Sequence, residues 1–244
     1  MDGTAHQQAY DRGHTIFSPD GRLYQVEYAR QAVERGSPAV GVQAAGGVVL
    51  AARKRLASPL LDPGSVEKIH QIDDHIAIAS AGHAADARQL VDHARLAAQR
   101  HRLQYGEPAP IESVTTALAD HVQESTQTGG SRPFGAALLV GGVDADGPGQ
   151  LYEVDPSGTP YGWRAVGVGD RSAAIRETFE STVATTEPRD VSVEDAASVA
   201  LDGLTEVDDD PDPDAYECLT IEPGPTVTRL STDELAVMIE ETAS

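Results

Sequence analysis

A single stretch near the N-terminus, residues 10–36, constrains the fold of this chain more than any other. It begins as a loop and reaches the turn SPDG at residues 18–21, where proline fixes φ and the Asp-Gly pair accepts tight-turn geometry. The spacing of apolar residues then predicts a helix over 23–35. We expect Gly36 to end this helix as a left-handed C-cap.

The helix expected over 23–35 has two non-polar faces. One is a stripe at helical spacing that consists of Leu23, Val26, Ala29 and Val33. Tyr24 and Tyr28 lie one turn apart to the side of that stripe. A helix with two non-polar faces usually has two partners, so we expect one face on the chain's own core and the other on a neighbouring molecule. On pattern alone, a core helix of an ordinary domain is an equal alternative.

The chain is strongly acidic. Its 244 residues include 39 Asp and Glu against 18 Lys and Arg, which gives a formal net charge of −21. This balance argues against a nucleic acid or an anionic membrane as partner. Hydrophobic residues make up 40% of the chain, enough for a sizeable core, so we expect the acids on a solvated surface. The lysines are only Lys54 and Lys68, and an acid-rich, lysine-poor surface suggests adaptation to concentrated salt, which screens self-repulsion.

The sequence offers little support for metal, cofactor or disulfide chemistry. Cys218 is the single cysteine, which leaves no disulfide framework and no cysteine metal site. The acidic segment 206–214 lacks the spacing of a calcium loop, and the histidines lack the HExxH pattern. We therefore expect no metal and no cofactor. The polar N-terminus and the lack of a long apolar run predict a cytoplasmic protein without a membrane span.

The order of the expected elements indicates the fold class. The expected strands cover 39–44, 48–52, 66–72, 76–81, 134–143, 150–155, 161–165, 166–168, 216–221 and 226–230. The expected later helices cover 82–104, 111–127, a segment from Asp170, a segment capped by Ser192, and 231–241. Runs of strands and runs of helices favour an α+β fold with antiparallel sheets and helices outside. A four-layer α-β-β-α sandwich satisfies this order, although propensity alone leaves other α+β folds open.

The residues of the N-terminal stretch also match a family signature. YDR at 10–12, FSPDGRL at 17–23 and QVEYA at 25–29 follow one another, and this succession closely resembles the signature of proteasome α-type subunits of the archaeal kind. The resemblance covers nearly the whole chain, and SRPFG at 131–135 matches a further family motif that we interpret as structural. It implies the N-terminal-nucleophile hydrolase fold with an extra N-terminal helix. The implied divisions are a gate segment and turn at 1–22, the helix at 23–36, and one sandwich domain at 37–244.

Catalytic β-type subunits of the same fold use a freed N-terminal threonine, an acidic residue and a lysine. Placing this chain on that pattern puts Ser37, Arg53 and Lys68 at the three positions. Ser37 is preceded by the helix and followed by Pro38, so it has no free amine unless the chain is cut there. Arg53 reverses the charge of the acid. We therefore expect no catalytic residue here. The alternatives are a self-processing N-terminal-nucleophile hydrolase and a stand-alone adaptor of the same fold.

The resemblance also implies an assembly. Seven α subunits form a ring that caps a ring of proteasome β subunits, and an activator AAA ATPase docks its C-terminal tail between α subunits so that unfolded proteins are degraded. The implied gate residues are Tyr10, Asp11, Pro19 and Tyr28, and the implied activator-docking residues are Lys68 and Gly82. Gly13, His14 and His83 depart from the family pattern close to the gate and the docking pocket.

Overall fold

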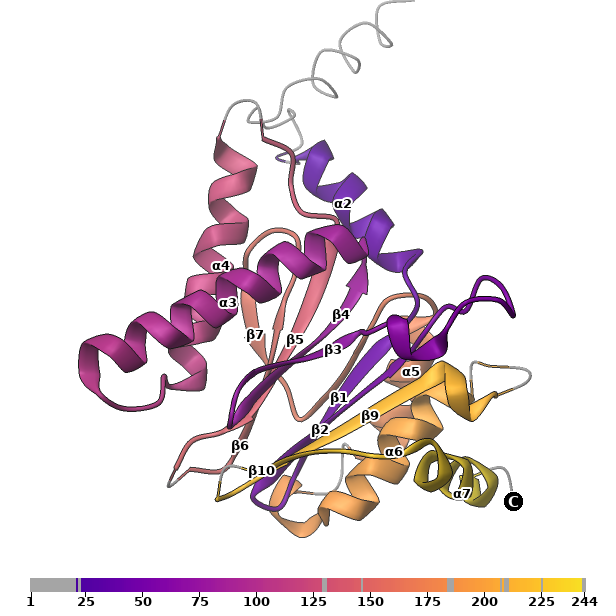
Figure 1. Ribbon diagram of the computed structural model, residues 1–244. Coiled ribbons are helices and arrows are strands. Elements are labelled where there is room, and N and C mark those ends of the chain that lie inside the picture. Colours follow the sequence, from indigo (N-terminus) through magenta and orange to yellow (C-terminus); the bar gives the residue numbers. More distant parts are fainter. Residues whose placement is uncertain are drawn as a thin grey trace, which may run out of the picture.

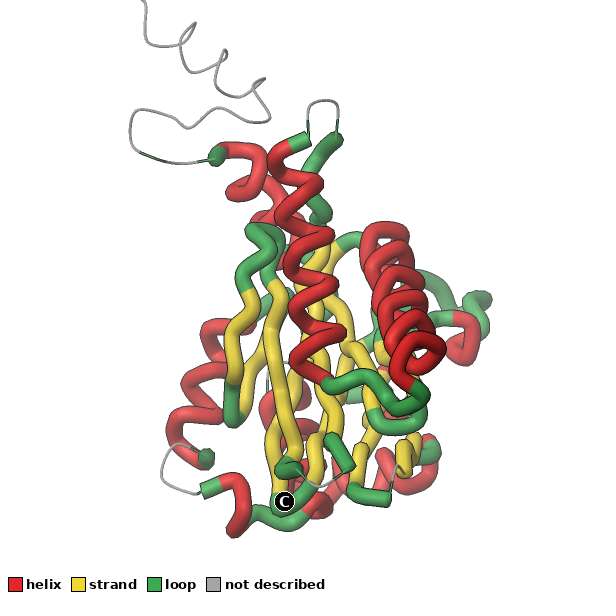
Figure 2. Tube along the Cα trace, turned by 90° about the vertical axis from the view of Figure 1, so that its left-hand side faces the viewer, coloured by secondary structure: helices red, strands yellow, loops and turns green. Residues whose placement is uncertain are grey.

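Two antiparallel sheets lie face to face in the computed structural model, which describes residues 21, 23–128, 131–145, 147–183, 187–206, 208, 211–224 and 226–242 (Figures 1 and 2). The first sheet has the order β10-β9-β2-β1-β8 and consists of β1 (Ala39–Ala44), β2 (Gly47–Arg53), β8 (Ala165–Val168), β9 (Tyr216–Glu222) and β10 (Thr226–Arg229). The second has the order β3-β4-β5-β6-β7 and consists of β3 (Ile69–Asp73), β4 (Ile76–Gly82), β5 (Ala136–Val143), β6 (Gly149–Val154) and β7 (Pro160–Gly162).

Helices cover the outer faces of both sheets. The second sheet is covered by α3 (Ala84–Tyr105) and α4 (Ile111–Gln127), and the first by α5 (Ser172–Thr182), α6 (Val193–Thr205) and α7 (Thr232–Thr242). The remaining helix, α2 (Tyr24–Glu34), lies at one end of the sandwich against β4 and β5 (Figure 1). Short 3-10 turns occur at Pro63–Ser65, Pro188–Asp190 and Pro213–Ala215. This arrangement confirms the expected α-β-β-α sandwich with an additional N-terminal helix.

Strand β2 shows why the sandwich has three apolar layers. Successive side chains of a strand point to opposite faces of its sheet. Val48, Leu50 and Ala52 therefore enter the layer between the two sheets, while Val49 and Ala51 enter the layer under α5, α6 and α7. A third layer fills the space between the second sheet and helices α3 and α4. A strand that is buried on both faces reads as a continuous apolar run, as GVVLAA does.

The C-terminal cap of α2 differs from the expectation. The C-cap is Arg35, in a right-handed conformation with φ −91°, and Gly36 is not among the described glycines with positive φ. The predicted left-handed cap at Gly36 is therefore wrong. A Cβ atom at Gly36 would lie 2.2 Å from the backbone nitrogen of Gly82, so glycine is needed there for a close backbone approach.

Several element boundaries also shift. The strand expected from residue 66 begins at Ile69, and the strand expected from residue 134 begins at Ala136. The helix expected from Gly82 begins at Ala84, because Gly82 is the last residue of β4. The helix expected from Asp170 begins at Ser172. The cap at Ser192 is confirmed, since its Oγ accepts a hydrogen bond from the Asp195 N–H at 3.0 Å. In the part of the chain that the structure describes, no helix has the length and hydropathy needed to cross a membrane.

Asp86 joins the start of α3 to the segment that leads into β5. Its carboxylate accepts hydrogen bonds from Nη1 and Nη2 of Arg132 at 2.6 and 2.7 Å and from the Gly135 N–H at 2.8 Å. The Asp86 side chain is 5% exposed. Burial alone would raise the pKa of this carboxyl group, but the Arg132 and Gly135 hydrogen bonds outweigh it and lower the pKa below 3.8. These contacts support the structural interpretation of residues 131–135.

We predict that Asp86→Asn lowers the free energy of unfolding by about 2 kcal/mol at pH 7, because Arg132 loses a bidentate charged partner. A carboxyl group with a lowered pKa stabilises the fold above its unfolded pKa, and this contribution is lost as pH falls through the folded value. The difference between variant and wild type should therefore shrink between about pH 5 and pH 3. Denaturant unfolding at constant salt measures it, with the exposed Asp92→Asn as the control. A difference that stays constant over this pH range contradicts the prediction.

Candidate functional site

A cavity of about 960 Å³ opens where three parts of the chain meet. One wall is the C-terminal end of α2, the second is the loop and segment that precede β3, and the third is the junction between β4 and α3. Lys68 and Gly82, the two residues implied in activator docking, both line this cavity, and so does His83. The fold therefore brings Lys68 and Gly82 to one cavity, although they lie on different walls of it.

Lys68 reaches across the cavity to the chain segment that follows α2. Its Nζ donates hydrogen bonds to the carbonyl oxygens of Ser37 and Pro38, the latter at 3.2 Å. Burial lowers the pKa of Lys68 from 10.5 to about 7, although the negative charge of Glu217 opposes this shift. No ion pair joins Lys68 to a carboxylate in the described part of the chain, and Glu67 lies instead beside His70, 3.6 Å from Oε2 to Nδ1. Among the described residues, the acceptors of the ammonium group are therefore neutral carbonyl oxygens, and no carboxylate forms an ion pair with it.

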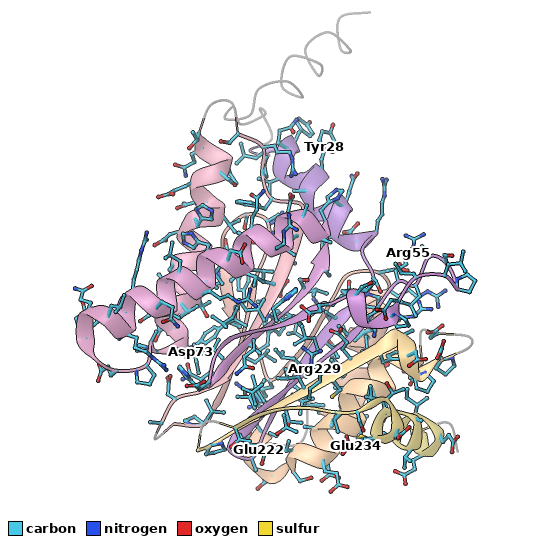
Figure 3. The ribbon with its side chains drawn as sticks, in the orientation of Figure 1. Tyr28, Arg55, Asp73, Glu222, Arg229 and Glu234 are labelled. Atoms are coloured by element: carbon cyan, nitrogen blue, oxygen red, sulfur yellow. The ribbon has the colours of Figure 1, made fainter. Side chains whose placement is uncertain are left out.

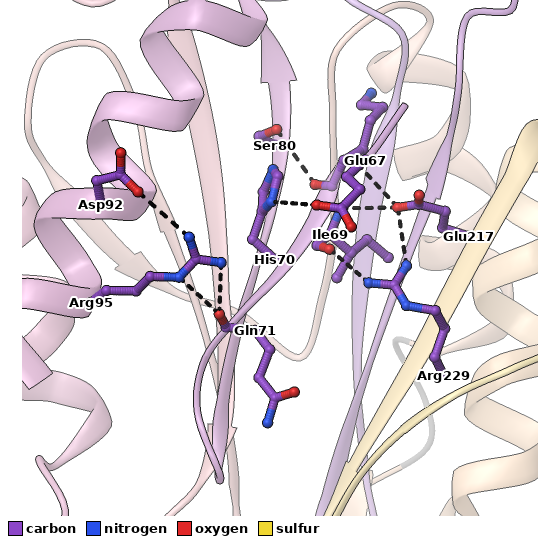
Figure 4. Close-up of polar contacts among 10 residues, drawn as sticks. Glu67, Ile69, His70, Gln71, Ser80, Asp92, Arg95, Glu217 and Arg229 are labelled. Carbon is purple, nitrogen blue, oxygen red and sulfur yellow. Dashed lines mark hydrogen bonds and ion pairs between the residues drawn. The ribbon is translucent and has the colours of Figure 1, made fainter. Parts of the chain in front are cut away.

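Glu217 holds the backbone of Lys68 and Ile69 in place (Figure 4). Its Oε2 accepts hydrogen bonds from the N–H groups of Lys68 and Ile69, at 3.1 and 3.0 Å, and lies 3.5 Å from Nη1 of Arg229. Arg229 also donates from Nη2 to the carbonyl oxygen of Ile69 at 3.0 Å. Glu217 and Arg229 belong to the first sheet and Ile69 begins β3 of the second. This cluster therefore ties the two sheets together directly behind Lys68.

Gly82 shapes the opposite wall through its backbone. Its φ is +105°, and an added Cβ atom would lie 2.2 Å from the carbonyl oxygen of Gly135, so a side chain there is excluded on both grounds. The next residue, His83, donates its N–H to the same oxygen at 2.8 Å. Together with the close approach of Gly36, this arrangement places the end of α2 against bare backbone at the end of β4. The helix and the cavity wall are therefore in rigid contact.

The three residues placed on the catalytic pattern also come together, but their chemistry does not match it. The Ser37 Oγ donates to the carbonyl oxygen of Arg53 at 2.5 Å, and Lys68 contacts the Ser37 carbonyl. The Ser37 nitrogen is part of a peptide bond, so it cannot accept the hydroxyl proton as a free α-amine does. Arg53 points to Asp208, with 2.7 Å between Nε and Oδ2. In the uncut chain, Ser37 therefore lacks the free α-amine that acts as the base in the catalytic pattern.

The gate residues are only partly placed by the structure. Tyr28 lies near the middle of α2, and 44% of its surface is exposed (Figure 3). Tyr10, Asp11 and Pro19 lie outside the described residues. Of the expected apolar stripe, Val26, Ala29 and Val33 are buried. Among the residues that the structure describes, no cluster of three His, Cys, Asp or Glu side chains has the arrangement of a metal site.

Sequence reasoning missed Glu217, Arg229 and the positive rim of the cavity. Glu217 contacts Lys68 across a separation of 149 residues, and no local pattern signals such a contact. Its only hint in the sequence is an acid inside an apolar strand, YECLTI, where a buried charge requires partners. Arg35, Arg55 and Arg88 also line the cavity, and they come from three separate segments. Their proximity becomes visible only in the folded chain.

The fold and this site define a class of protein. Two stacked antiparallel sheets between helical layers form the N-terminal-nucleophile hydrolase sandwich, and in it Lys68 donates a hydrogen bond to the carbonyl oxygen of Ser37. The family model for proteasome subunits matches residues 33–221, and the model for the N-terminal signature of A-type proteasome subunits matches residues 10–32. The chain belongs to the proteasome subunit family and is an α-type member of the 20S core.

Relatives over nearly the full chain agree with this assignment. The proteasome α1 subunit of Haloferax volcanii is 52% identical over 98% of this chain and 94% of its own length. The proteasome α subunit of Natronomonas pharaonis is 50% identical over 99% of this chain and 94% of its own length. The proteasome α subunit of Haloquadratum walsbyi is 55% identical over 86% of this chain and 82% of its own length. These relatives come from halophilic archaea, in keeping with the acidic, lysine-poor composition, and the family assembles with other proteasome subunits.

Proposed function

We propose that this chain is a non-catalytic subunit of a heptameric α ring that controls access of unfolded proteins to a chamber formed with β subunits. In this proposal the cavity around Lys68 and Gly82 docks the C-terminal tail of an activator AAA ATPase. The observation that carries the proposal is that Lys68 and Gly82 line one cavity, and the end of α2 forms another wall of it. A docking site that shares a wall with this helix has a physical route to the gate segment at 1–22.

The contacts of Lys68 provide that route. Its ammonium group donates to the carbonyl oxygens of Ser37 and Pro38, the first residues after the α2 turn. A terminal carboxylate is a stronger acceptor for an ammonium group than a peptide carbonyl, because the bond is charge-assisted on both sides. A docked tail would therefore compete for Lys68 and loosen the segment that holds the end of α2. Tyr10, Asp11, Pro19 and Tyr28 would then stabilise the open pore between neighbouring subunits.

We predict that deleting residues 1–12 raises the rate of peptide hydrolysis by the assembled particle in the absence of any activator. The physical reason is that a polar segment before the turn at Pro19 obstructs the pore in this proposal. A matched control replaces the same residues with a Gly/Ser segment of equal length, which keeps the bulk and loses the specific side chains. Native mass spectrometry verifies the ring. An unchanged rate in intact particles contradicts a gating role.

We predict that Lys68→Ala leaves ring assembly and basal peptidase activity intact but abolishes stimulation by the activator ATPase. Lys68→Arg should restore stimulation only in part, because a guanidinium group is wider than an ammonium group. The matched control is Lys54→Ala, since Lys54 is the other lysine of the chain and lies outside the cavity lining. Lys68→Ala also leaves two carbonyl oxygens without a donor, so thermal unfolding of each variant is compared. Full stimulation in Lys68→Ala places docking elsewhere.

The lowered pKa of Lys68 predicts that docking depends on pH. A carboxylate binds the protonated lysine, and with a pKa of about 7 the unbound lysine loses its proton as pH rises through neutrality. The affinity for a peptide with a free C-terminal carboxylate should therefore be constant below about pH 6.5 and fall by up to about tenfold per pH unit above pH 7.5. Fluorescence anisotropy at constant salt measures this dependence. Lys68→Arg should flatten it, and a flat profile in the wild type contradicts the prediction.

A further inference from the structure

The cavity is positively charged in a strongly acidic protein. Among the described residues, four cationic side chains line it, namely Lys68, Arg35, Arg55 and Arg88, whereas Glu67 is the single acidic lining residue. The whole chain has 39 acids and 18 bases, so this ratio is reversed at the cavity. A local excess of positive charge within a chain of net charge −21 indicates a partner with negative charge.

The arginines of the cavity differ from most other arginines of the described residues. Most of those form ion pairs with carboxylates of the same chain, namely Arg30, Arg53, Arg95, Arg102, Arg132, Arg164 and Arg229. Arg35, Arg55 and Arg88 form no ion pair and no side-chain hydrogen bond within the described part of the chain, and all three are exposed. The cavity therefore gathers three arginines that have no ion-pair partner among the described residues.

A single terminal carboxylate does not account for these groups. The ammonium group of Lys68 is a sufficient charged partner for one terminal carboxylate. The guanidinium groups of Arg35, Arg55 and Arg88 would then have no carboxylate partner from the ligand. At about 960 Å³ the cavity is near the upper end of ligand pockets, roughly 300–1,000 Å³, so it holds more than one carboxylate group. Each guanidinium fork matches a side-chain carboxylate in bidentate geometry.

High salt strengthens this argument. The Debye length is about 3 Å in 1 M salt, so a diffuse positive field has little effect there and only direct contacts recognise a ligand. Arginine pairs with carboxylates through short directed hydrogen bonds and is weakly hydrated. Three arginines from separate segments around one cavity are thus suited to specific recognition in the concentrated salt to which this composition is adapted.

We propose that the cavity recognises an acidic C-terminal peptide, with Lys68 binding the terminal carboxylate and Arg55 and Arg88 binding side-chain carboxylates of the residues that precede it. This inference rests on the proposed docking function and specifies its partner. The activator tail that fits this cavity carries acidic side chains in addition to its free C-terminus. Arg35, at the end of α2, extends the same surface toward the helix.

The test uses the assembled ring of full-length chains and three fluorescein-labelled octapeptides at constant molar salt. The first peptide has two glutamates near a free C-terminus, the second has glutamines in their place, and the third is the glutamate peptide with a C-terminal amide. We expect the glutamate peptide to bind about tenfold more tightly than the glutamine peptide. The net negative charge of the ring repels the glutamate peptide more strongly than the glutamine peptide. Tighter binding of the glutamate peptide therefore reports direct contacts within the cavity.

Arginine variants test which side chains cause the tighter binding of the glutamate peptide. Arg55→Gln combined with Arg88→Gln should abolish the difference between the glutamate and glutamine peptides and leave ring assembly unchanged. Arg100→Gln is the matched control, because Arg100 is an exposed arginine of α3 outside the cavity lining, and it should keep the full difference.

Each result has a distinct meaning. Equal binding of the two free-carboxylate peptides to the wild type, or a preference that persists in the double variant, overturns this inference. Loss of the ring in the double variant also overturns it, because the arginines then pair with a neighbouring molecule of the ring. Equal binding of the amide and the free-carboxylate glutamate peptides instead overturns the docking function itself. The two proposals therefore fail through different measurements.

Discussion

The proposed function of this molecule depends on the contacts of the Lys68 ammonium group. This group joins the segment before β3 to the carbonyl oxygens that follow α2, and burial brings its pKa to about 7. A buried ammonium group that has only neutral acceptors is held at a cost in free energy. In the proposed docking, an incoming carboxylate relieves that cost, so the contact that holds the end of α2 in the unbound protein would also favour binding of an anion.

The surrounding structure makes this contact rigid. Glu217 and Arg229 clamp the backbone at Lys68 and Ile69 from the opposite sheet. On the far wall, the bare backbone of Gly36 and Gly82 allows α2 to lie directly on the end of β4. A displacement of the Lys68 side chain should therefore be transmitted to the end of α2, because no flexible side chain lies between the backbone of Gly36 and that of Gly82.

Much of the fold was predictable because its signals are local. The continuous apolar run of β2, the cap at Ser192 and the interruption of helices by glycine each depend on neighbours in sequence. Gly36 shows the limit, since a glycine after a helix is typical of a left-handed cap, while this one is required by its approach to Gly82. Lys68 and Gly82 were associated only through family resemblance. Glu217 and the cavity arginines could not be predicted, because their partners come from distant segments.

The central claim is that a carboxylate takes Lys68 from its carbonyl acceptors and thereby moves the end of α2. The most direct measurement is an electron cryomicroscopy structure of the assembled ring with a bound peptide that has a free C-terminus, compared with the unbound ring. The account predicts the peptide carboxylate within hydrogen-bond distance of Lys68 Nζ, the contacts to Ser37 and Pro38 weakened or lost, and a shifted end of α2. A bound peptide that leaves Lys68 on both carbonyl oxygens, or lies away from this cavity, contradicts the account.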